Sequence, residues 1–395
     1  MAQKESPEIQ LPIPNQKLWT VNFVLICLSN LVVFMSFHSL LPTLPIYIQN
    51  LGGSKSTAGL ALGFIMISAI ILRPLAGWFL DNYGRKFILV VGLVVFLVPS
   101  MVYVTMVSII PLLILRLIQG IGWGVCTTAQ GTVAADIIPP KRLGEGLGYF
   151  SLTISLSLAI APAMGLWLID KFSFQHLFAA CSVLTFLSLL FALSVKYPKR
   201  VNPITKSKLV LFEKDALRPA MVALMLGLTY SALLSFVALF VLQQGLTTAG
   251  WFFTVMAVTS MLARPMAGNL VDLKGRRGYD AAVATGMISM ILCLLVLAQT
   301  SATWHLVVSG LLFGIGFGFL QPTMMALCIN SVPSNRKGGA TATFWFAYDI
   351  GVGTGSIGWG FVASILGYSA MFLLNIIPAV IGLLIYFLHK KPVST

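Results

Sequence analysis

The chain has 395 residues, of which 58% are hydrophobic and only 9% are charged, and its mean hydropathy is +0.93. Soluble globular proteins carry about 25% charged residues, so this composition excludes a soluble domain and indicates an integral membrane protein. The formal net charge of +14 favours a face against anionic lipid headgroups and does not predict a nucleic-acid partner.

The apolar residues form runs of roughly 20 residues, the length at which a helix crosses about 30 Å of hydrocarbon. These runs are predicted to be helices, because a spanning segment must satisfy its own backbone hydrogen bonds. No apolar stretch with a small-residue cleavage site precedes them, so we expect no cleaved signal peptide. We predict twelve spans, at about 18–41, 57–80, 87–107, 111–135, 143–168, 176–195, 218–242, 248–271, 279–299, 304–330, 338–364 and 369–388.

The distribution of basic residues predicts the orientation. Of the 25 Lys and Arg, only Lys55 and Lys171 fall in loops that lie outside if the N-terminus is cytoplasmic, so the positive-inside rule places both termini in the cytoplasm. The five cysteines fall in predicted spans and are expected to be small core residues rather than disulfides or metal ligands. The expected parts are a tail at 1–17, a six-helix bundle at 18–195, a basic linker at 196–217, a second six-helix bundle at 218–388 and a tail at 389–395.

Two sequence echoes relate the halves. "RPLAGWFLDNYGRK" (Arg73 to Lys86) returns 191 positions later as "RPMAGNLVDLKGRR" (Arg264 to Arg277), and "GIGWG" at Gly120 returns 194 positions later as "GIGFG". An even number of spans separates the copies, so both lie at the cytoplasmic face. The halves are therefore predicted to be parallel repeats, related by an axis along the membrane normal.

These motifs resemble those of the major facilitator superfamily over essentially the whole chain, and within it those of the twelve-helix drug/proton antiporters. The motif of the loop between the second and third helices matches at Gly77, Asp81, Gly84, Arg85 and Lys86. The fourth-helix motif matches at Leu112, Arg116, Gln119, Gly120 and Gly122. The fifth-helix antiporter motif matches at Gly148, Pro162 and Gly165, whereas Ser157, Ala161 and Leu166 replace its glycines.

The resemblance implies an all-α membrane protein with two pseudo-symmetric six-helix bundles and a conformational latch at the cytoplasmic face. Small residues at helix ends allow close helix packing, and Asp81 can meet a helix N-terminus or an arginine of its own loop. A merely solvated, charged turn is the alternative. The latch residues would be Gly77, Asp81, Gly84, Arg85 and Lys86, with a second copy at Gly268, Asp272, Gly275 and Arg276.

Three ionisable residues inside predicted spans are the candidates for proton coupling or substrate binding. Asp349 is the acid nearest the midplane, where burial disfavours its ionised form unless a cation or water is near, and it is the first candidate. Arg116 lies about 7 Å into the bilayer, where snorkelling to the headgroups is the alternative. His38 can carry a proton or simply pack by hydrogen bonding. The sequence leaves open whether Arg116 and Asp349 meet.

Weaker predictions concern the cavity and the gates. Arg73 and Arg264 occupy equivalent repeat positions, which favours gate or packing roles over substrate contact. We assign the same gate or packing role to Gly148, Pro162 and Gly165. Candidate cavity side chains, polar or aromatic, are Gln119, Gln130, Tyr230, Gln243, Gln321, Trp345 and Tyr348.

No constellation of acids, histidines and nucleophiles indicates an enzyme, so we expect no catalytic residue, no metal and no cofactor. We expect a monomeric, multi-pass transporter in a bacterial inner (plasma) membrane that exports lipophilic or amphipathic small molecules. The proton gradient would supply the energy by exchange, with the two bundles rocking about a midplane site. The alternatives are a proton-coupled exporter of a specific metabolite, metallophore or glycolipid and, less favoured, a solute uptake symporter.

Overall fold

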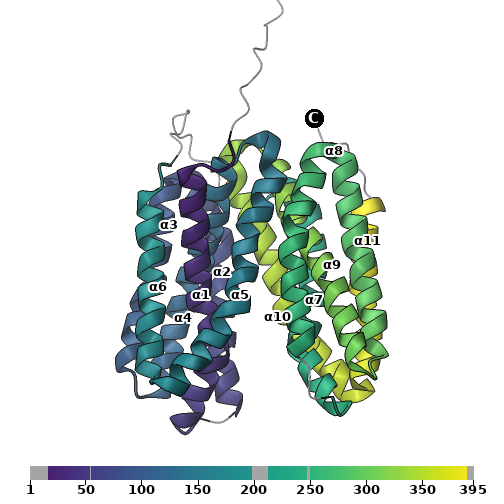
Figure 1. Cartoon of the computed structure of the whole chain (residues 1–395). Helices are drawn as coiled ribbons and strands as arrows, with labels where there is room; N and C mark the ends of the chain where they lie inside the picture. The colour runs from purple at the N-terminus through teal and green to yellow at the C-terminus, as the bar shows by residue number, and fades with distance from the viewer. Residues whose placement is uncertain (1–16, 54, 198–211, 247–249, 389–395) are drawn as a thin grey trace, which may run out of the picture.

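The computed structural model describes residues 17–53, 55–197, 212–246 and 250–388, and within these ranges it is helical without a strand. Figure 1 shows two groups of long helices side by side. The first group is α1 (Val21–Asn50), α2 (Lys55–Tyr83), α3 (Arg85–Val102), α4 (Ile109–Ile137), α5 (Leu143–Lys171) and α6 (Phe174–Ser194). The second is α7 (Leu217–Gln243), α8 (Gly250–Ala298), α9 (Thr303–Asn330), α10 (Lys337–Leu374) and α11 (Ile376–Leu388).

Ten helical runs of the described residues are long and apolar enough to cross a membrane, and two of them are too long for one crossing. The run 251–298 has 48 residues, which is about 72 Å of helix against roughly 30 Å of hydrocarbon. Gly275 (φ 49°) turns the chain in the middle of α8, and Gly367 (φ 80°) turns it within α10. Each of these runs therefore crosses twice, and the fold has the twelve transmembrane segments that the sequence predicts.

Two helix boundaries differ from the predicted spans. α1 continues beyond the predicted end at 41, through Pro42, to Asn50. The last crossing is interrupted at Asn375, between α10 and α11, and the side-chain amide of Asn375 donates to the carbonyl oxygen of Thr229 at 3.1 Å. This bond satisfies a backbone acceptor inside the bundle, which hydrocarbon could not do.

The two bundles meet through two pairs of helices. α2 of the first bundle packs on α10 of the second, and α5 of the first packs on α8 of the second. The end of α6, the start of α7 and the turn within α8 all lie at one end of the molecule, at the top of Figure 1. We call this the linker end. The charged contacts between the bundles lie at this end or between it and the middle of the helices.

Candidate functional site

Asp81, at the linker end of α2, is held by the N-terminus of α10. Its two carboxylate oxygens accept hydrogen bonds from the backbone N–H groups of Gly338 (3.0 Å) and Gly339 (2.8 Å). An N–H group at a helix N-terminus has no partner within the helix, and the helix dipole favours an anion there. The contact joins the two bundles, and we call it the first anchor.

Basic and acidic side chains surround the first anchor. Arg85 donates to Asp81 at 2.8 Å and to Asp136, at the end of α4, at 2.9 Å. Lys337 reaches Asp136 from the other bundle, with a nitrogen–oxygen distance of 3.3 Å. Four charged groups from α2, α3, α4 and α10 thus form one ionic network across the interface between the bundles.

Asp272, on α8, makes the equivalent contact with α5. Its carboxylate oxygens accept from the backbone N–H groups of Gly144 (2.9 Å) and Glu145 (2.7 Å). We call this contact the second anchor. Arg276, the repeat equivalent of Arg85, is exposed and lies in none of the ion pairs among the described residues.

Glycine allows the close approach of the helices at both anchors. A Cβ atom at Gly77 would lie 2.6 Å from that of Ala342, and one at Gly268 would overlap the backbone of Gly144 and Glu145. Gly84 ends α2 with φ 97°, in the region that favours glycine. Lys86 is exposed beside it.

Farther from the linker end, Arg73 of α2 and Asp349 of α10 form a buried ion pair between the bundles. The guanidinium Nε lies 2.7 Å from Asp349 Oδ2, and the two side chains are 2% and 11% exposed. The Arg73 guanidinium also donates to the hydroxyl oxygens of Thr127 (3.1 Å) and Thr128 (3.4 Å) on α4, and it lies over the ring of Trp345. Asp349 is thus partnered, and its partner is Arg73 rather than Arg116.

Helix geometry explains this pairing. Arg73 precedes Asp81 by eight residues, or about 12 Å of helix, and Asp349 follows Gly339 by ten, or about 15 Å. Because the first anchor fixes Asp81 against Gly339, the two side chains arrive at nearly the same depth. Both side chains were predicted separately from the sequence, but their pairing was not, because it follows only once the contact of Asp81 with Gly339 is known.

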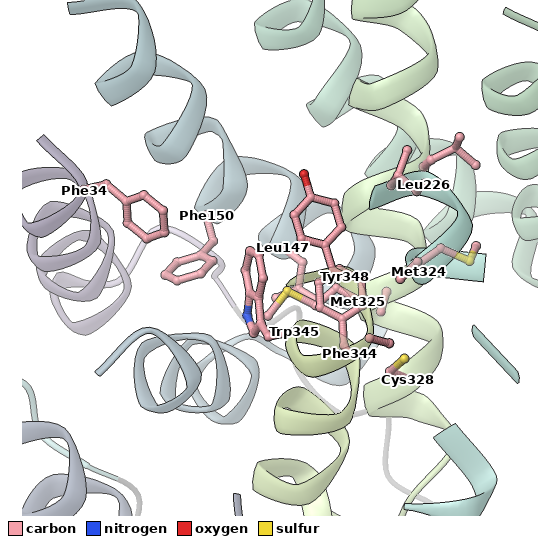
Figure 2. Close-up of a cluster of buried hydrophobic side chains, with 14 of the residues drawn as sticks. Phe34, Leu147, Phe150, Leu226, Met324, Met325, Cys328, Phe344, Trp345 and Tyr348 are labelled. Carbon is pink, nitrogen blue, oxygen red and sulfur yellow. The ribbon is translucent and has the colours of Figure 1, made fainter. Parts of the chain in front are cut away.

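In Figure 2, aromatic side chains from both bundles gather near Trp345, whose ring lies against Arg73. Figure 2 shows Phe34 and Phe150 of the first bundle facing Trp345 and Tyr348 of α10. The Trp345 and Tyr348 rings are perpendicular, with centroids 5.8 Å apart. Trp345 Nε1 is buried and has no hydrogen-bond partner among the described residues, so this cluster retains a free donor in an otherwise apolar wall.

Arg116 belongs to a separate network inside the first bundle. It donates to Gln119 Oε1 at 2.8 Å, the Tyr103 hydroxyl donates to the same oxygen at 2.9 Å, and Gln119 donates to Ser100 at 2.8 Å. Arg116 is 11 positions along α4 from Thr127, which is about 16 Å of helix. Its charge is therefore held away from the Arg73–Asp349 pair.

The remaining ionisable or amide candidates are dispersed. His38 Nδ1 shares a hydrogen bond with Ser157 (2.9 Å), between α1 and α5, and Gln130 donates to Ser29 (3.0 Å), between α4 and α1. Gln243 is exposed at the end of α7, away from the aromatic cluster. Gln321, on α9, is buried, and its Oε1 has no partner among the described residues.

The candidates for packing lie at helix contacts. A Cβ at Gly148 would lie 2.7 Å from the backbone oxygen of Arg264, in the contact between α5 and α8. A Cβ at Gly165 would lie 2.7 Å from the backbone oxygen of Ser39, in the contact between α5 and α1. Pro162 lies inside α5 without ending it.

Arg264, the repeat equivalent of Arg73, is fully buried among aromatic side chains. Its guanidinium lies over the ring of Phe317, 5.3 Å from the centroid, Tyr230 stacks on the same ring, and the Tyr348 ring lies beside that of Tyr230. Only Nε has a hydrogen bond, at 3.4 Å to Ser260, whereas Nη1 and Nη2 have none among the described residues.

The arrangement is suited to conformational coupling rather than to bond chemistry. No cluster of three or more His, Cys, Asp or Glu side chains that could hold a metal ion occurs in the described part of the chain. What connects the two bundles is a set of carboxylates, each held by a group of the opposite bundle. A change in the charge of such a carboxylate alters the free energy of one packing of the bundles relative to another.

The chain is similar in sequence to known transporters. A sequence model described as the Major Facilitator Superfamily matches residues 26–356 and 242–395. The chain is 25% identical, over 380 residues, to an uncharacterized MFS-type transporter of Methanocaldococcus jannaschii, covering 92% of this chain and 97% of that protein. It is 27% identical, over 377 residues, to the multi-drug resistance efflux pump PmrA of Streptococcus pneumoniae, covering 90% and 92%.

The fold itself matches solved transporter structures. A bacterial homologue of the iron transporter ferroportin, crystallised in an outward-facing state, superimposes with a TM-score of 0.79. The match covers 92% of this chain and 98% of that protein, at 13% sequence identity.

Proposed function

Because the chain belongs to the major facilitator superfamily and is a transporter, we propose that it is a secondary active exporter that exchanges lipophilic or amphipathic small molecules for protons. The observation that carries this proposal is the buried Arg73–Asp349 pair between α2 and α10. The efflux relative from Streptococcus pneumoniae supports the direction of transport. Export of a specific metabolite and, less favoured, uptake are the alternatives that the experiment below can distinguish.

Asp349 is the coupling residue in this proposal. Protonation neutralises the carboxylate that holds Arg73, and it thereby weakens one of the contacts that keep α2 against α10. Breaking a buried pair leaves an uncompensated arginine and is costly, so proton binding has different free energies in the closed and open arrangements. This difference is what allows a proton gradient to drive the rocking of the bundles.

The anchors set the direction in which the site is open. With the linker end in the cytoplasm, as the positive-inside rule predicts, Asp81 and Asp272 close the cytoplasmic side and the site faces outward. Protons would then reach Asp349 from outside and be released inside after the anchors separate. The outward-facing ferroportin homologue, with the same fold, is consistent with this assignment of state.

Proton exchange in everted membrane vesicles tests the proposal. The vesicles are acidified inside by respiration, and lipophilic cations, amphipathic anions and metal chelates are added in turn to wild type and Asp349→Asn. We expect at least one compound to dissipate the gradient with wild type and not with Asp349→Asn. Asp170→Asn is the matched control, because Asp170 is 72% exposed and pairs only weakly with Lys171.

The outcomes separate the alternatives. Equal dissipation by wild type and Asp349→Asn would show that Asp349 is structural. Dissipation by metal chelates alone would indicate an exporter of a specific metabolite or metallophore. A substrate that is accumulated together with protons in right-side-out vesicles would replace export by symport.

A further inference from the structure

The second buried arginine at the bundle interface is chemically unlike the first. Arg73 has a carboxylate, two threonine hydroxyls and the Trp345 ring around it. Arg264, at the equivalent repeat position, has one long hydrogen bond and the Phe317 ring. Since a guanidinium carries five N–H donors and no acceptor, most of the hydrogen-bonding capacity of Arg264 is unused.

The repeat shows which group is different. At the offset of 194 that relates Gly338 to Gly144, the position equivalent to Asp349 is Ser155 on α5, and the position equivalent to Thr127 is Gln321 on α9. A neutral serine thus replaces the acid that neutralises Arg73. Among the residues that the structure describes, no carboxylate forms an ion pair with Arg264.

Burial makes this asymmetry costly. Arg264 is 0% exposed, and both Nη1 and Nη2 are buried without a partner in the described part of the chain. A buried charge is normally paired, because desolvation is otherwise uncompensated, and a cation–π contact offsets only part of that cost. The arginine is therefore kept in a position where an anion from outside the chain would lower its free energy.

The surroundings of Arg264 indicate what kind of anion fits. Tyr230 stacks on Phe317 with ring centroids 4.8 Å apart and an interplanar angle of 15°, and Phe313 continues the stack. Figure 2 shows the hydroxyl of Tyr348 directed out of the labelled cluster of side chains. A planar apolar body could lie against these rings, while phenol O–H and guanidinium N–H groups donate to its acidic group.

Gln321 lies on the same side of this aromatic wall. It follows Phe317 by four residues, one turn along α9, and residues at this spacing share a helix face. The buried Gln321 side chain therefore borders the same region. Tyr230 on α7, Arg264 on α8 and Tyr348 on α10 thus place polar groups near the Phe317 ring, and Gln321 lies one helical turn farther along α9.

We propose that Arg264, flanked by Tyr230, Phe317 and Tyr348, is the binding site for the acidic group of an aromatic, amphipathic anionic or zwitterionic substrate. The inference rests on the proposed transport function and specifies its substrate class. Arg73 has its anion within the protein, so it serves coupling, whereas Arg264 obtains its anion from the transported molecule. This assignment replaces the gate or packing role that the sequence alone suggested for Arg264.

Binding to the purified full-length protein in lipid nanodiscs, without a proton gradient, tests this assignment. The probes are naphthalene-1-acetate, naphthalene-1-acetamide and 2-(1-naphthyl)ethylamine, with pyrene-1-butyrate and its amide as a larger pair. Each acid and its amide share an aromatic body, so their affinity ratio isolates the acidic group from partition into lipid. Affinities are followed by quenching of tryptophan fluorescence and by shifts in the unfolding temperature.

We expect wild type to bind at least one acid about tenfold more tightly than its amide, as for a hydrogen-bonded charge. Arg264→Gln should bring this ratio to about one, and Arg264→Lys should retain part of it. Arg277→Gln, a change at an exposed arginine of the same helix, should leave the ratio as in wild type. Without ligand, Arg264→Gln should raise the unfolding temperature, since it removes an unpaired buried charge.

Several results would overturn the assignment. They are a wild-type ratio near one, no binding of either acid at millimolar concentration, or an unchanged ratio in Arg264→Gln. If Arg264→Gln does not fold, Tyr348→Phe removes only a hydroxyl and should lower the ratio several-fold; an unchanged ratio there is equally contrary. The binding test needs no proton gradient, so it can be carried out even if the vesicle experiment shows no proton exchange. If the protein exchanges cations for protons but binds neither acid, only the inference about Arg264 is refuted.

Discussion

The two anchors differ in how charge is arranged around the same backbone contact. Each carboxylate accepts two N–H groups at a helix N-terminus of the opposite bundle. Around Asp81, the side chains of Arg85, Asp136 and Lys337 extend the contact into an ionic network. Around Asp272, the equivalent of Arg85 is exposed and the equivalent of Asp136 is Asn330, which donates to Tyr279 instead.

This difference indicates that the two anchors have different roles. The second anchor depends on a helix N-terminus and on close packing at Gly268, and the charged side chains beside it, Arg142 and Glu145, pair with each other within the first bundle. The first anchor depends on charges from α2, α3, α4 and α10, and it lies on the same helix pair as Arg73 and Asp349. The Arg73–Asp349 pair, whose carboxylate would bind the proton, thus lies on the same helices as the first anchor, which depends on neighbouring charges.

Removal of each anchor carboxylate should produce the largest effect and an unequal one. Asp81→Asn keeps one acceptor oxygen but loses one N–H contact and the charge that pairs with Arg85, so we expect it to favour separation at the linker end by about 3 kcal/mol. Asp272→Asn loses a helix-capping contact, worth about 1 kcal/mol. Distance distributions between spin labels, at positions 86 and 335 across the first anchor and at 141 and 274 across the second, would measure both shifts.

Equal shifts in the two variants would contradict the comparison. All four labelled positions are exposed, so the labels alone are not expected to disturb either contact. The native cysteines would be replaced in this background, because five are present.

Replacement of the two equivalent arginines should give a smaller but clearer contrast. Arg85→Gln leaves Asp81 and Asp136 without the cation between them, and we expect a shift of about 2 kcal/mol toward separation of the first anchor. Arg276→Gln alters an exposed side chain and should change the same equilibrium by less than about 0.5 kcal/mol. The two variants can be compared at 50 and 500 mM salt, where only the Arg85 effect should depend on salt. A salt-dependent Arg276→Gln shift of similar size would remove the distinction.

A third carboxylate beside the first anchor should make it weakly sensitive to pH. Glu213 lies against Gly339 and pairs with Arg336, and burial raises the pKa of Glu213 above its usual value, against the lowering effect of Arg336. An acid with a raised folded-state pKa stabilises the fold below its unfolded pKa of about 4.3, and this contribution is lost as pH rises through the folded pKa.

The corresponding measurement is the unfolding temperature of wild type and Glu213→Gln between pH 8 and pH 4.5. Wild type should gain stability relative to Glu213→Gln as the pH falls, by less than about 1 kcal/mol. Asp170→Asn, at a 72% exposed position on α5, is the matched control and should follow wild type. A wild-type loss of stability on acidification relative to Glu213→Gln would contradict the sign.

The long apolar runs were sufficient to predict the spans but not every helix end. The turns at Gly275 and Gly367 fall where polar or glycine-containing segments separate apolar runs. The continuation of α1 through Pro42 and the break at Asn375 were not predicted. Neighbouring helices determine where a helix continues or breaks, because they can provide hydrogen-bond partners for backbone groups that lack one within their own helix. Asn375 does this for the carbonyl oxygen of Thr229.

The candidate site was predictable residue by residue, but its partners were not. The rarity of ionisable residues in apolar spans was enough to select Asp349, Arg116 and His38 as candidates. It could not show that Asp349 pairs with Arg73, that Arg116 bonds to Gln119 within its own bundle, or that Gln243 is exposed. These outcomes depend on helix rotation and on the depth at which two bundles meet.

The amino-acid sequence by itself determined the membrane class, the twelve spans, the repeat and the family, because hydrocarbon thickness and backbone hydrogen bonding constrain local composition strongly. Only the tertiary structure decided which equivalent arginine has an acid. Arg73 and Arg264 stand in almost identical sequence contexts, and Asp349 and Ser155 lie far from them in the chain. Charge pairing is a property of facing helices, and no local pattern in the chain encodes it.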